Sequence, residues 1–553
     1  MQENIKIFAL GGLDENGKSL YVVSYNEQLY IFDAGLRYPE EKLLGVDIIL
    51  PDYEYLLSVK DQIRGIFLTH GHDENIGALP FILEEIPGVD VYATNFTLLS
   101  LFNSAKRLKK NINSAIFHRI TENQTFIVNG MTVHSFAVTH SVPESCGFAL
   151  ETEKGLIVYP GDFIIDFSAR PPYSCNVERM LELAKKPTLA LLSESYNASY
   201  QGYVNPTQHI LPKIVPILEE TKGKVFVSIY GQTISQFEEL LKAAIQTKRK
   251  VYLYTAFSKD IFDLLKKHIE SFTFDDSLFT TNIFENDTLV IISELGNKVF
   301  EQLTNLAENK DENSLHPAMD DTIVIASPAH TGTELSFARI LDKLYKTEAR
   351  VVNLTKDITS MHAGSEDLKT MLSIFKPKYY IPVRGYYSKM IENAKIALNL
   401  GYNHKNIFVY DNGMVINIRN GEIVPATVDQ DFIQCSEIMV DGIGIGDVGN
   451  VVINDRRKLQ QDGTMIIGIS FSMMSRKIVT PPEIQIRGFK VADERAFKDR
   501  IGTLFREVVH EYIQKPGLID FNELRQLCKD RILEQIRTEM DKEPMVLPVI
   551  ISV

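Results

Sequence analysis

The sequence has few cysteines, no tryptophan and no long uninterrupted apolar run. Its four cysteines, Cys146, Cys175, Cys435 and Cys528, lie far apart among 553 residues. No pair has the Cys-x-x-Cys spacing, which argues against both a disulfide framework and a thiolate metal site. No apolar run approaches the roughly 18 residues that a membrane-spanning helix needs. The absence of tryptophan excludes nothing, but the absence of a long apolar run predicts a chain without a membrane span.

Positive charge is also in deficit. The 58 lysines and arginines stand against 72 aspartates and glutamates, so the formal net charge is −14. This balance argues against a protein covered in nucleic acid through bulk charge, but it leaves room for a local basic channel. The first six residues are acidic and polar, and the apolar stretch after them is too short for a signal peptide. From these features and the cysteine pattern, we expect a reduced, soluble, cytoplasmic protein.

The length and the hydrophobic periodicity predict an α/β protein of several domains. At about 150 residues per domain, 553 residues correspond to roughly three to four domains. Short strands with tight turns are expected in residues 1–60, and alternating strands and helices follow to about 205. The pattern then changes to helix-rich βα units, which include a strand over 224–229 and a helix over 235–247. Glycines punctuate 442–449, and a helix is expected from about 494 to 512.

The strongest chemical signal is Thr69-His70-Gly71-His72, directly after a short apolar strand. Two histidines at positions i and i+2 of a loop can direct both imidazoles at one metal ion, because the strand fixes their direction. Two further candidates, His140 and Asp162, also stand at expected strand ends. Three imidazoles and one carboxylate form a suitable site for zinc or manganese.

These motifs, preceded by Asp33-Ala34-Gly35, resemble the signature of the metallo-β-lactamase superfamily. Three later segments are similar to the motifs of the β-CASP nucleases: Ser193-Glu194-Ser195, Ser360-Met361-His362 and Pro382-Val383-Arg384-Gly385. Other segments narrow the resemblance to the ribonuclease J family: residues 11–18, 141–145, 441–449, 486–489 and 547–549. The resemblance covers essentially the whole chain.

The resemblance implies an αββα metallo-β-lactamase sandwich, interrupted by an inserted β-CASP α/β domain and followed by a small C-terminal αβ domain. The expected boundaries are 1–205 and 356–430 for the sandwich, 206–355 for the insertion, 431–454 for a linker and 455–553 for a dimerisation domain. It also implies RNA phosphodiester hydrolysis in RNA processing and decay. The implied activity is a 5′-to-3′ exonuclease that favours a 5′-monophosphate, together with endonuclease cuts, and uses two metal ions.

The sequence departs from the family at the second metal ion. An Asp-His pair is Glu74-Asn75 here, and a third-motif histidine is Arg384. Glutamate reaches about 1 Å further than aspartate, which is a large misplacement for catalysis. An amide is a poor ligand for a transition metal, and a guanidinium cannot bind a cation. We therefore expect a degraded second site, formed by Glu74, Asn75 and Arg384.

The first metal site keeps all its ligands, His70, His72, His140 and Asp162. At most one divalent ion, zinc or manganese, is expected there. The alternative is no metal, with these residues only hydrogen-bonded in a core. Asp73 stands one residue too early to replace the lost aspartate.

The resemblance also implies catalytic and RNA-binding residues. The expected catalytic residues are Glu74, Glu194 and His362, although Glu194 is equally suited to orienting a neighbouring ligand. Arg384 would supply a fixed positive charge that pairs with Asp162 or Glu74, or that receives a phosphate. The expected substrate-binding residues are Gln232, Thr233, Ser235, Thr359, Ser360, Met361, His362 and Arg384. The segment 232–235 lacks the histidine that usually contacts substrate in the family.

The overall pattern resembles the second, weakly active or inactive paralogue that accompanies a competent ribonuclease J in some Gram-positive bacteria. We therefore expect weak hydrolysis, 5′-monophosphorylated RNA as ligand, and a homodimer or a mixed oligomer with an active relative. One alternative is a fully active metalloribonuclease that tolerates Glu74 or uses a single ion. Another is a scaffold subunit that binds RNA without hydrolysis. Metal content and turnover by the isolated chain separate the three.

Overall fold

The computed structural model describes residues 3–39, 45–269, 272–282, 285–310, 315–329, 333–424, 432–442, 444–445 and 450–553. Residues 443 and 446–449 of the glycine-rich segment lie outside this description. The chain forms two compact units, and each is described by itself. The first unit comprises Met1–Glu41 with Ile48–Ile438, and the second comprises Lys42–Asp47 with Met439–Val553.

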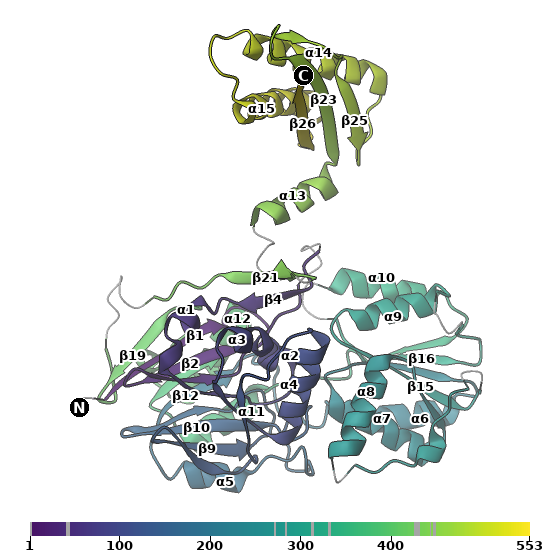
Figure 1. The fold of residues 1–553 in the computed structure, drawn as a ribbon. Helices are drawn as coiled ribbons and strands as arrows, with labels where there is room; N and C mark the ends of the chain where they lie inside the picture. Colours follow the sequence, from purple (N-terminus) through teal and green to yellow (C-terminus); the bar gives the residue numbers. More distant parts are fainter. Residues whose placement is uncertain are drawn as a thin grey trace. The chain divides into compact units, whose positions relative to one another are not determined.

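The first unit contains two sheets that pack face to face (Figure 1). One sheet has eight strands in the order β20-β19-β1-β2-β3-β5-β6-β7. Its strands are β1 (Asn4–Gly11), β2 (Leu20–Tyr25), β3 (Gln28–Phe32), β5 (Ile63–Phe67), β6 (Asp90–Ala93), β7 (Ile116–Arg119), β19 (Val415–Arg419) and β20 (Glu422–Ile423). The other sheet has six strands in the order β18-β12-β11-β10-β9-β8. They are β8 (Thr125–Val128), β9 (Met131–Ala137), β10 (Cys146–Thr152), β11 (Gly155–Tyr159), β12 (Thr188–Glu194) and β18 (Tyr379–Val383).

Aromatic side chains fill the space between the two sheets. Phe32 and Phe67 from the first sheet meet Phe148 from the second, with ring centroids 6.2 and 5.5 Å apart. All three belong to one continuous buried cluster. Strand alternation directs these residues inward, because successive side chains of a strand point to opposite faces. The cluster fixes one sheet against the other and so fixes the ends of their strands.

Helices cover the outer face of each sheet, which completes the four layers. The helices that precede β7 are α1 (Glu54–Ser58), α2 (Asp73–Ile76), α3 (Leu79–Glu85) and α4 (Asn95–Arg107). Against the six-stranded sheet pack α5 (Val177–Leu183), α11 (Ser365–Phe375) and α12 (Tyr387–Asn399), through a cluster that includes Met180, Leu368 and Ile396. This is the αββα sandwich that the resemblance to the family implies. The short strand β4 spans Ile48–Pro51. Among the described residues, the 3₁₀ helices are η1 (Lys60–Gln62), η2 (Asp276–Leu278) and η3 (His404–Asn406).

A third sheet is inserted between β12 and β18, which are themselves paired in parallel. It is entirely parallel, with the order β14-β15-β13-β16-β17. Its strands are β13 (Val225–Tyr230), β14 (Lys250–Leu253), β15 (Thr288–Glu294), β16 (Thr322–Ile325) and β17 (Arg350–Asn353). One face packs on α6 (Leu211–Glu220), α7 (Ile234–Thr247) and α8 (Ala256–His268). The other face packs on α9 (Lys298–Ala307) and α10 (Glu334–Leu344).

The second unit is a small αβ domain. Its central strand β23 (Thr464–Ser472) pairs with β24 (Lys477–Ile478), β25 (Glu483–Arg487) and β26 (Met545–Ser552). The helices α14 (Glu494–Ile513) and α15 (Phe521–Met540) pack on this sheet. The remaining elements are β21 (Glu437–Asp441), β22 (Gly444–Ile445) and α13 (Asn450–Gln461), and α13 spans the expected boundary between residues 454 and 455. Among the described residues, no helix has the length and apolar character needed to cross a membrane.

Candidate active site

Four of the predicted metal ligands converge at the ends of three strands. His70 and His72 follow β5, His140 follows β9, and Asp162 follows β11. One ligand atom from each of the four lies within 4.8 Å of the others. All four side chains are buried. We call the three histidines the imidazole cluster.

Hydrogen bonds to the outer nitrogens define the tautomers of two members of the imidazole cluster. The Nδ1 of His140 lies 2.7 Å from the carbonyl oxygen of Met361, and the Nε2 of His72 lies 3.0 Å from that of Gln232. A carbonyl oxygen only accepts, so each of these ring nitrogens carries the proton. The remaining nitrogens, His140 Nε2 and His72 Nδ1, then face each other as lone pairs at 3.3 Å. Two lone pairs at this separation repel unless a cation lies beside them.

His70 completes the same arrangement. Its Nδ1 lies 2.9 Å from the hydroxyl of Thr69, which itself donates to Asp33 at 2.9 Å, so His70 Nδ1 is the donor. Its Nε2 is buried, has no hydrogen-bond partner among the described residues, and lies 3.7 Å from Asp162. An unpartnered buried nitrogen is costly in the absence of a ligand.

Electrostatics keeps the imidazole cluster in its ligand form. Burial lowers the pKa of His70, His72 and His140, so all three are neutral at pH 7. Neutral imidazoles and a carboxylate are preferred ligands of zinc, and the outer bonds to Thr69 and to two carbonyls hold their directions. These four residues therefore fit one divalent metal ion.

The Asp162 carboxylate also contacts a guanidinium. Arg384 follows β18, and its Nε lies 3.4 Å from both carboxylate oxygens, while its Nη2 lies 3.4 Å from Oδ2. Burial by itself raises the pKa of Asp162, but the charge of Arg384, and then that of His362, outweigh burial and hold this pKa below its ordinary value. Asp162 is therefore ionised at neutral pH.

The residues of the second metal site do not fit a metal ion. The amide nitrogen of Asn75 donates to Asp33 at 2.8 Å, so the side chain is oriented by that carboxylate. Glu74 accepts a hydrogen bond of 2.9 Å from the side chain of Gln232. Arg384 brings a positive charge of its own, and its guanidinium has no lone pair to offer a metal ion.

Asp73, one residue earlier, is engaged elsewhere. Its carboxylate receives Arg107 at 2.8 Å, the hydroxyl of Tyr38 at 2.6 Å and that of Ser104 at 3.2 Å. These bonds tie the start of α2 to α4 and turn Asp73 away from the imidazole cluster.

Glu194 and His362 form a pair beside Asp162. Glu194 ends β12, and its Oε2 accepts from Nδ1 of His362 at 2.7 Å. Its Oε1 accepts the backbone N–H groups of Phe163 and Ala363 at 2.8 and 3.0 Å. The carboxylate accepts three hydrogen bonds from protein groups, so Glu194 orients His362 and the loop after Asp162. His362 lies 3.8 Å from Asp162.

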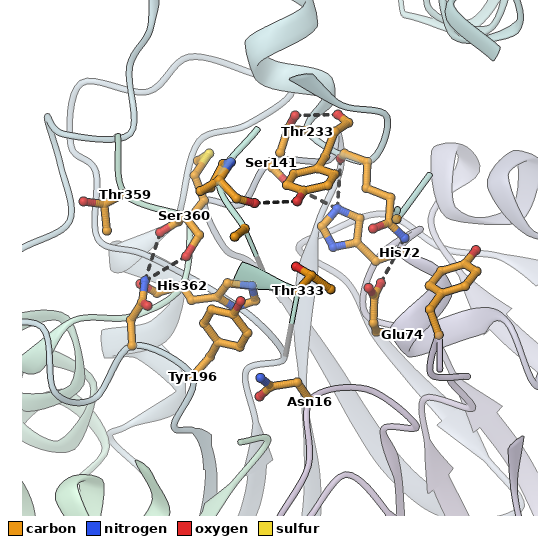
Figure 2. A pocket seen from close by; sticks show the side chains of 18 of the residues that line it. Asn16, His72, Glu74, Ser141, Tyr196, Thr233, Thr333, Thr359, Ser360 and His362 are labelled. Atoms are coloured by element: carbon orange, nitrogen blue, oxygen red, sulfur yellow. Dashed lines mark hydrogen bonds between the residues drawn. The ribbon is translucent and has the colours of Figure 1, made fainter. Parts of the chain in front are cut away.

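A cleft of about 430 Å³ opens beside these residues, between the sandwich and the inserted sheet of the first unit. Figure 2 shows Ser360 and His362 across the opening from His72 and Glu74. Of the expected substrate-binding residues, those that line the cleft are Gln232, Thr233, Thr359, Ser360, Met361, His362 and Arg384. Ser235 does not line it, and its hydroxyl lies 3.4 Å from the sulfur of Met361.

Two residues that line the cleft, Tyr196 and Asn197, are not identified by the sequence motifs. Tyr196 stacks on His362 with ring centroids 4.3 Å apart. The guanidinium carbon of Arg384 lies 5.9 Å from the centroid of the Tyr196 ring. The amide nitrogen of Asn197 donates to both oxygens of Ser360 at 3.0 and 3.1 Å. Their only signal in the sequence is that they directly follow Ser193-Glu194-Ser195, and nothing local distinguishes them from ordinary loop residues.

A second hollow of about 630 Å³ shares His72 and Gln232 with the cleft. Lys106 and Arg107 of α4 and Lys267 of α8 line it. Two cations of the basic segment Lys106-Arg107-Leu108-Lys109-Lys110 are paired, because Arg107 contacts Asp73 and Lys110 contacts Glu84 at 2.7 Å.

Comparison with family models gives three matches. Residues 13–198 match the metallo-beta-lactamase superfamily, and residues 349–408 match the Zn-dependent metallo-hydrolase RNA specificity domain. Residues 451–553 match the ribonuclease J C-terminal domain. The three segments lie in the sandwich, across the return from the inserted sheet, and in the second unit.

Whole-length relatives are found as well. Ribonuclease J2 of Bacillus subtilis (strain 168) is 32% identical over 560 residues, which covers 100% of this chain and 99% of the relative. Ribonuclease J 2 of Staphylococcus saprophyticus is 31% identical over 556 residues, covering 99% and 98% of the two chains. Ribonuclease J 2 of Staphylococcus aureus (strain NCTC 8325 / PS 47) is 30% identical over 560 residues, with the same coverage.

Among solved structures, the crystal structure of a protein of unknown function from Enterococcus faecalis V583 is similar in fold. Its TM-score is 0.52 at 17% identity, and the match covers 75% of this chain and 100% of that one.

Proposed function

This chain belongs to the ribonuclease J family, and from that premise we propose that it binds RNA in the cleft and hydrolyses it weakly. The observation that carries the proposal is the contrast between two ligand sets. His70, with its unpartnered Nε2, converges with the rest of the imidazole cluster on Asp162. Arg384 and Asn75 stand where the resemblance implies two further ligands, but a guanidinium has no lone pair and an amide is a poor ligand for a transition metal.

The proposed chemistry follows from the positions of the side chains. A divalent ion held by the imidazole cluster and Asp162 would supply an activated water and polarise a phosphate oxygen. His362 has its Nδ1 bound to Glu194, so its Nε2 is the nitrogen that can donate to a phosphate oxygen of RNA. Glu74 faces the cleft and is the carboxylate suited to receive a proton from water.

Weak hydrolysis follows from the loss of half of the metal clamp. Two ions stabilise the attacking and the leaving oxygen of an in-line displacement, and one ion stabilises only one of them. The proposal is therefore an enzyme of reduced turnover, in which zinc is the metal suggested by the matched RNA specificity domain and manganese is the alternative.

Hydrolysis of a 5′-monophosphorylated RNA by the pure chain tests this proposal. The chain is produced in a host that lacks ribonuclease J and is supplied with zinc or manganese. The control is a His70→Ala, His72→Ala double variant. Slow cleavage that disappears in the double variant is the expected result.

Cleavage equal to that of the control contradicts the proposal and supports a non-catalytic RNA-binding subunit. Cleavage at an ordinary enzymatic turnover, about 1–10³ per second, also contradicts it and supports a fully active metalloribonuclease. The metal content of the same preparations separates a scaffold without metal from both enzymes.

We also propose that the second unit forms an oligomer interface, in a homodimer or with an active relative. Alternate residues of β26 are buried in the core of this unit, whereas Leu547, Val549 and Ile551 are exposed, as is Ile466 on β23. An exposed row of large apolar side chains on one sheet is typical of an interaction surface. We call these four residues the apolar sheet face.

A further inference from the structure

The guanidinium of Arg384 keeps one nitrogen, Nη1, that its pairing with Asp162 does not use. The residue is 3% exposed, and its Nη1 is buried without a hydrogen-bond partner among the described residues. The bonds to Asp162 use only Nε and Nη2, and all are 3.4 Å long. A guanidinium presents five N–H donors in a rigid fork and stays charged at every physiological pH.

The backbone holds this guanidinium in a fixed place. Arg384 has φ of 57°, a left-handed conformation that is uncommon for a residue with a side chain. Its N–H donates to the carbonyl of Gly12 at 2.9 Å, and its own carbonyl accepts from Ser195 at 3.0 Å. Contacts from two separate loops thus hold Arg384 in this conformation and direct its side chain toward Asp162 at the wall of the cleft.

Of the two arginines that line the cleft, Arg384 is the one with a buried terminal nitrogen, Nη1, that has no hydrogen-bond partner among the described residues. The other arginine that lines the cleft is Arg37, which pairs with Glu437 at 2.7 Å and with Glu15 at 3.6 Å. Glu74 also lines the cleft, and Asp162 lies beside the cleft against Arg384. These two carboxylates would repel an anion if no cation stood in the cleft wall.

A second hydrogen-bond donor for an anion, His362, lies close to Arg384. His362 and Arg384 both contact Oδ2 of Asp162, at 3.8 and 3.4 Å. Tyr196 stacks on the ring of His362 and lies 5.9 Å from the guanidinium, so it supports both side chains. A phosphate oxygen that reaches the guanidinium would receive the unused Nη1–H, and charge-assisted bonds of this kind are about twice as strong as neutral ones.

We propose that Arg384 replaces the second metal ion as a built-in cation, so that the cleft binds an RNA phosphate without any metal. The inference rests on the proposed function, since it concerns the same cleft and the same ligand. It separates binding from catalysis: the guanidinium neutralises Asp162 and holds a phosphate, but it cannot activate water as a metal ion does.

The test measures binding of a short 5′-monophosphorylated oligoribonucleotide by fluorescence anisotropy, with and without EDTA. The proteins are the wild type, Arg384→Met and Arg384→Lys. Arg350→Met is the matched control, because it removes the same charge from the exposed end of β17, outside the cleft. Circular dichroism establishes that each variant is folded.

We expect EDTA to change the wild-type Kd by less than about twofold. In EDTA, Arg384→Met should bind about tenfold more weakly or worse, with the salt dependence of log K reduced by about one phosphate contact. Arg384→Lys should lose less, because it keeps the charge but not the fork. Arg350→Met should bind as the wild type does.

Two results would overturn the inference. EDTA could abolish wild-type binding while the metal-loaded protein still binds, which assigns the phosphate to the metal and leaves the proposed function intact. Arg384→Met could bind in EDTA as tightly as the wild type. An absence of RNA binding with and without metal would instead refute the proposed function itself, and the inference with it.

Discussion

Three side chains distinguish this centre from a two-metal nuclease at the scale of single residues. Arg384 contacts Asp162, Asn75 donates to Asp33, and Glu74 accepts from Gln232. Each is engaged by a protein group at a position where the resemblance implies a metal ligand. The change therefore lies in the chemistry of the side chains rather than in the fold that carries them.

The triple variant Glu74→Asp, Asn75→His, Arg384→His should restore a second metal ion. It returns two imidazoles and a shorter carboxylate and removes the competing guanidinium. We expect the metal content per chain to rise from about one to about two, measured by mass spectrometry of the dialysed protein, with faster RNA hydrolysis.

Arg350→His serves as the control for that experiment, because it adds an imidazole outside the cleft. If the triple variant binds no additional metal and hydrolyses RNA no faster, the account of the second site is wrong.

Among contacts between secondary-structure elements, the salt-bridged side chain of His209 joins the sandwich to α7. The Nδ1 of His209 contacts Glu239 on α7, and its Nε2 lies 3.7 Å from Asp166 in the loop after β11. Hydrogen bonds to Asp166 and then to Glu239 raise the pKa of His209 to about 9. The same helix begins beside Gln232 and Thr233, so this contact lies on the element that carries one wall of the cleft.

The stability contributed by His209 should depend on pH. The folded pKa is raised above the unfolded value of about 6.5, so the contribution is complete below pH 6.5 and is lost as pH rises through about 9. Because the imidazole is partly exposed, we expect only about 1 kcal/mol in the free energy of unfolding. Urea denaturation of the wild type and His209→Gln at pH 6 and pH 10 measures it.

The difference between the two proteins should be larger at pH 6 than at pH 10. An equal difference at both values would mean that the imidazolium charge does not stabilise this contact. His404→Gln, in a 3₁₀ helix and without a resolved ion pair among the described contacts, is the matched control.

The aromatic cluster between the two sheets positions the strand ends that carry the candidate metal ligands. Phe67 is fully buried and is the last residue of β5, three residues before His70. Phe67→Ala should lower the free energy of unfolding by about 3–5 kcal/mol, because it removes a large buried ring and leaves a cavity. Chemical denaturation measures the loss, and Phe167→Ala, whose ring is 76% exposed, should cost almost nothing.

A loss for Phe67→Ala as small as that for Phe167→Ala would show that the sheets repack around the cavity. The position of the metal ligands would then not depend on this ring.

At the scale of the whole molecule, the apolar sheet face predicts an assembly. Val549→Glu together with Ile551→Glu places two charges among the exposed apolar side chains of β26. We expect this double variant to lower the molar mass in light scattering from that of an oligomer to that of one chain of 62.7 kDa.

Leu518→Glu is the control for the assembly, because Leu518 is fully exposed in the connection between α14 and α15. An unchanged mass for the double variant, or a wild-type chain that is already monomeric, would refute the interface. Mixing with an active family member then tests the mixed oligomer in the same way.

Several elements could be predicted from local sequence. The helix expected over 494–512 is α14, and the strand and helix expected over 224–229 and 235–247 are β13 and α7. Periodicity identifies these elements because each buries one regular face. The resemblance to the family added the four-layer sandwich and the inserted sheet, which periodicity alone does not specify.

The sequence by itself determined which side chains are available: three histidines and an aspartate at strand ends, with an arginine and an asparagine in place of two further ligands. Side-chain chemistry is fixed by residue type, and strand ends fix approximate direction. Only the tertiary structure decided their partners. Asn75 with Asp33, Asp73 with Arg107, and Tyr196 beneath His362 are contacts between segments far apart in the chain. Such contacts depend on how the two sheets and the inserted domain pack, and no local pattern encodes that packing.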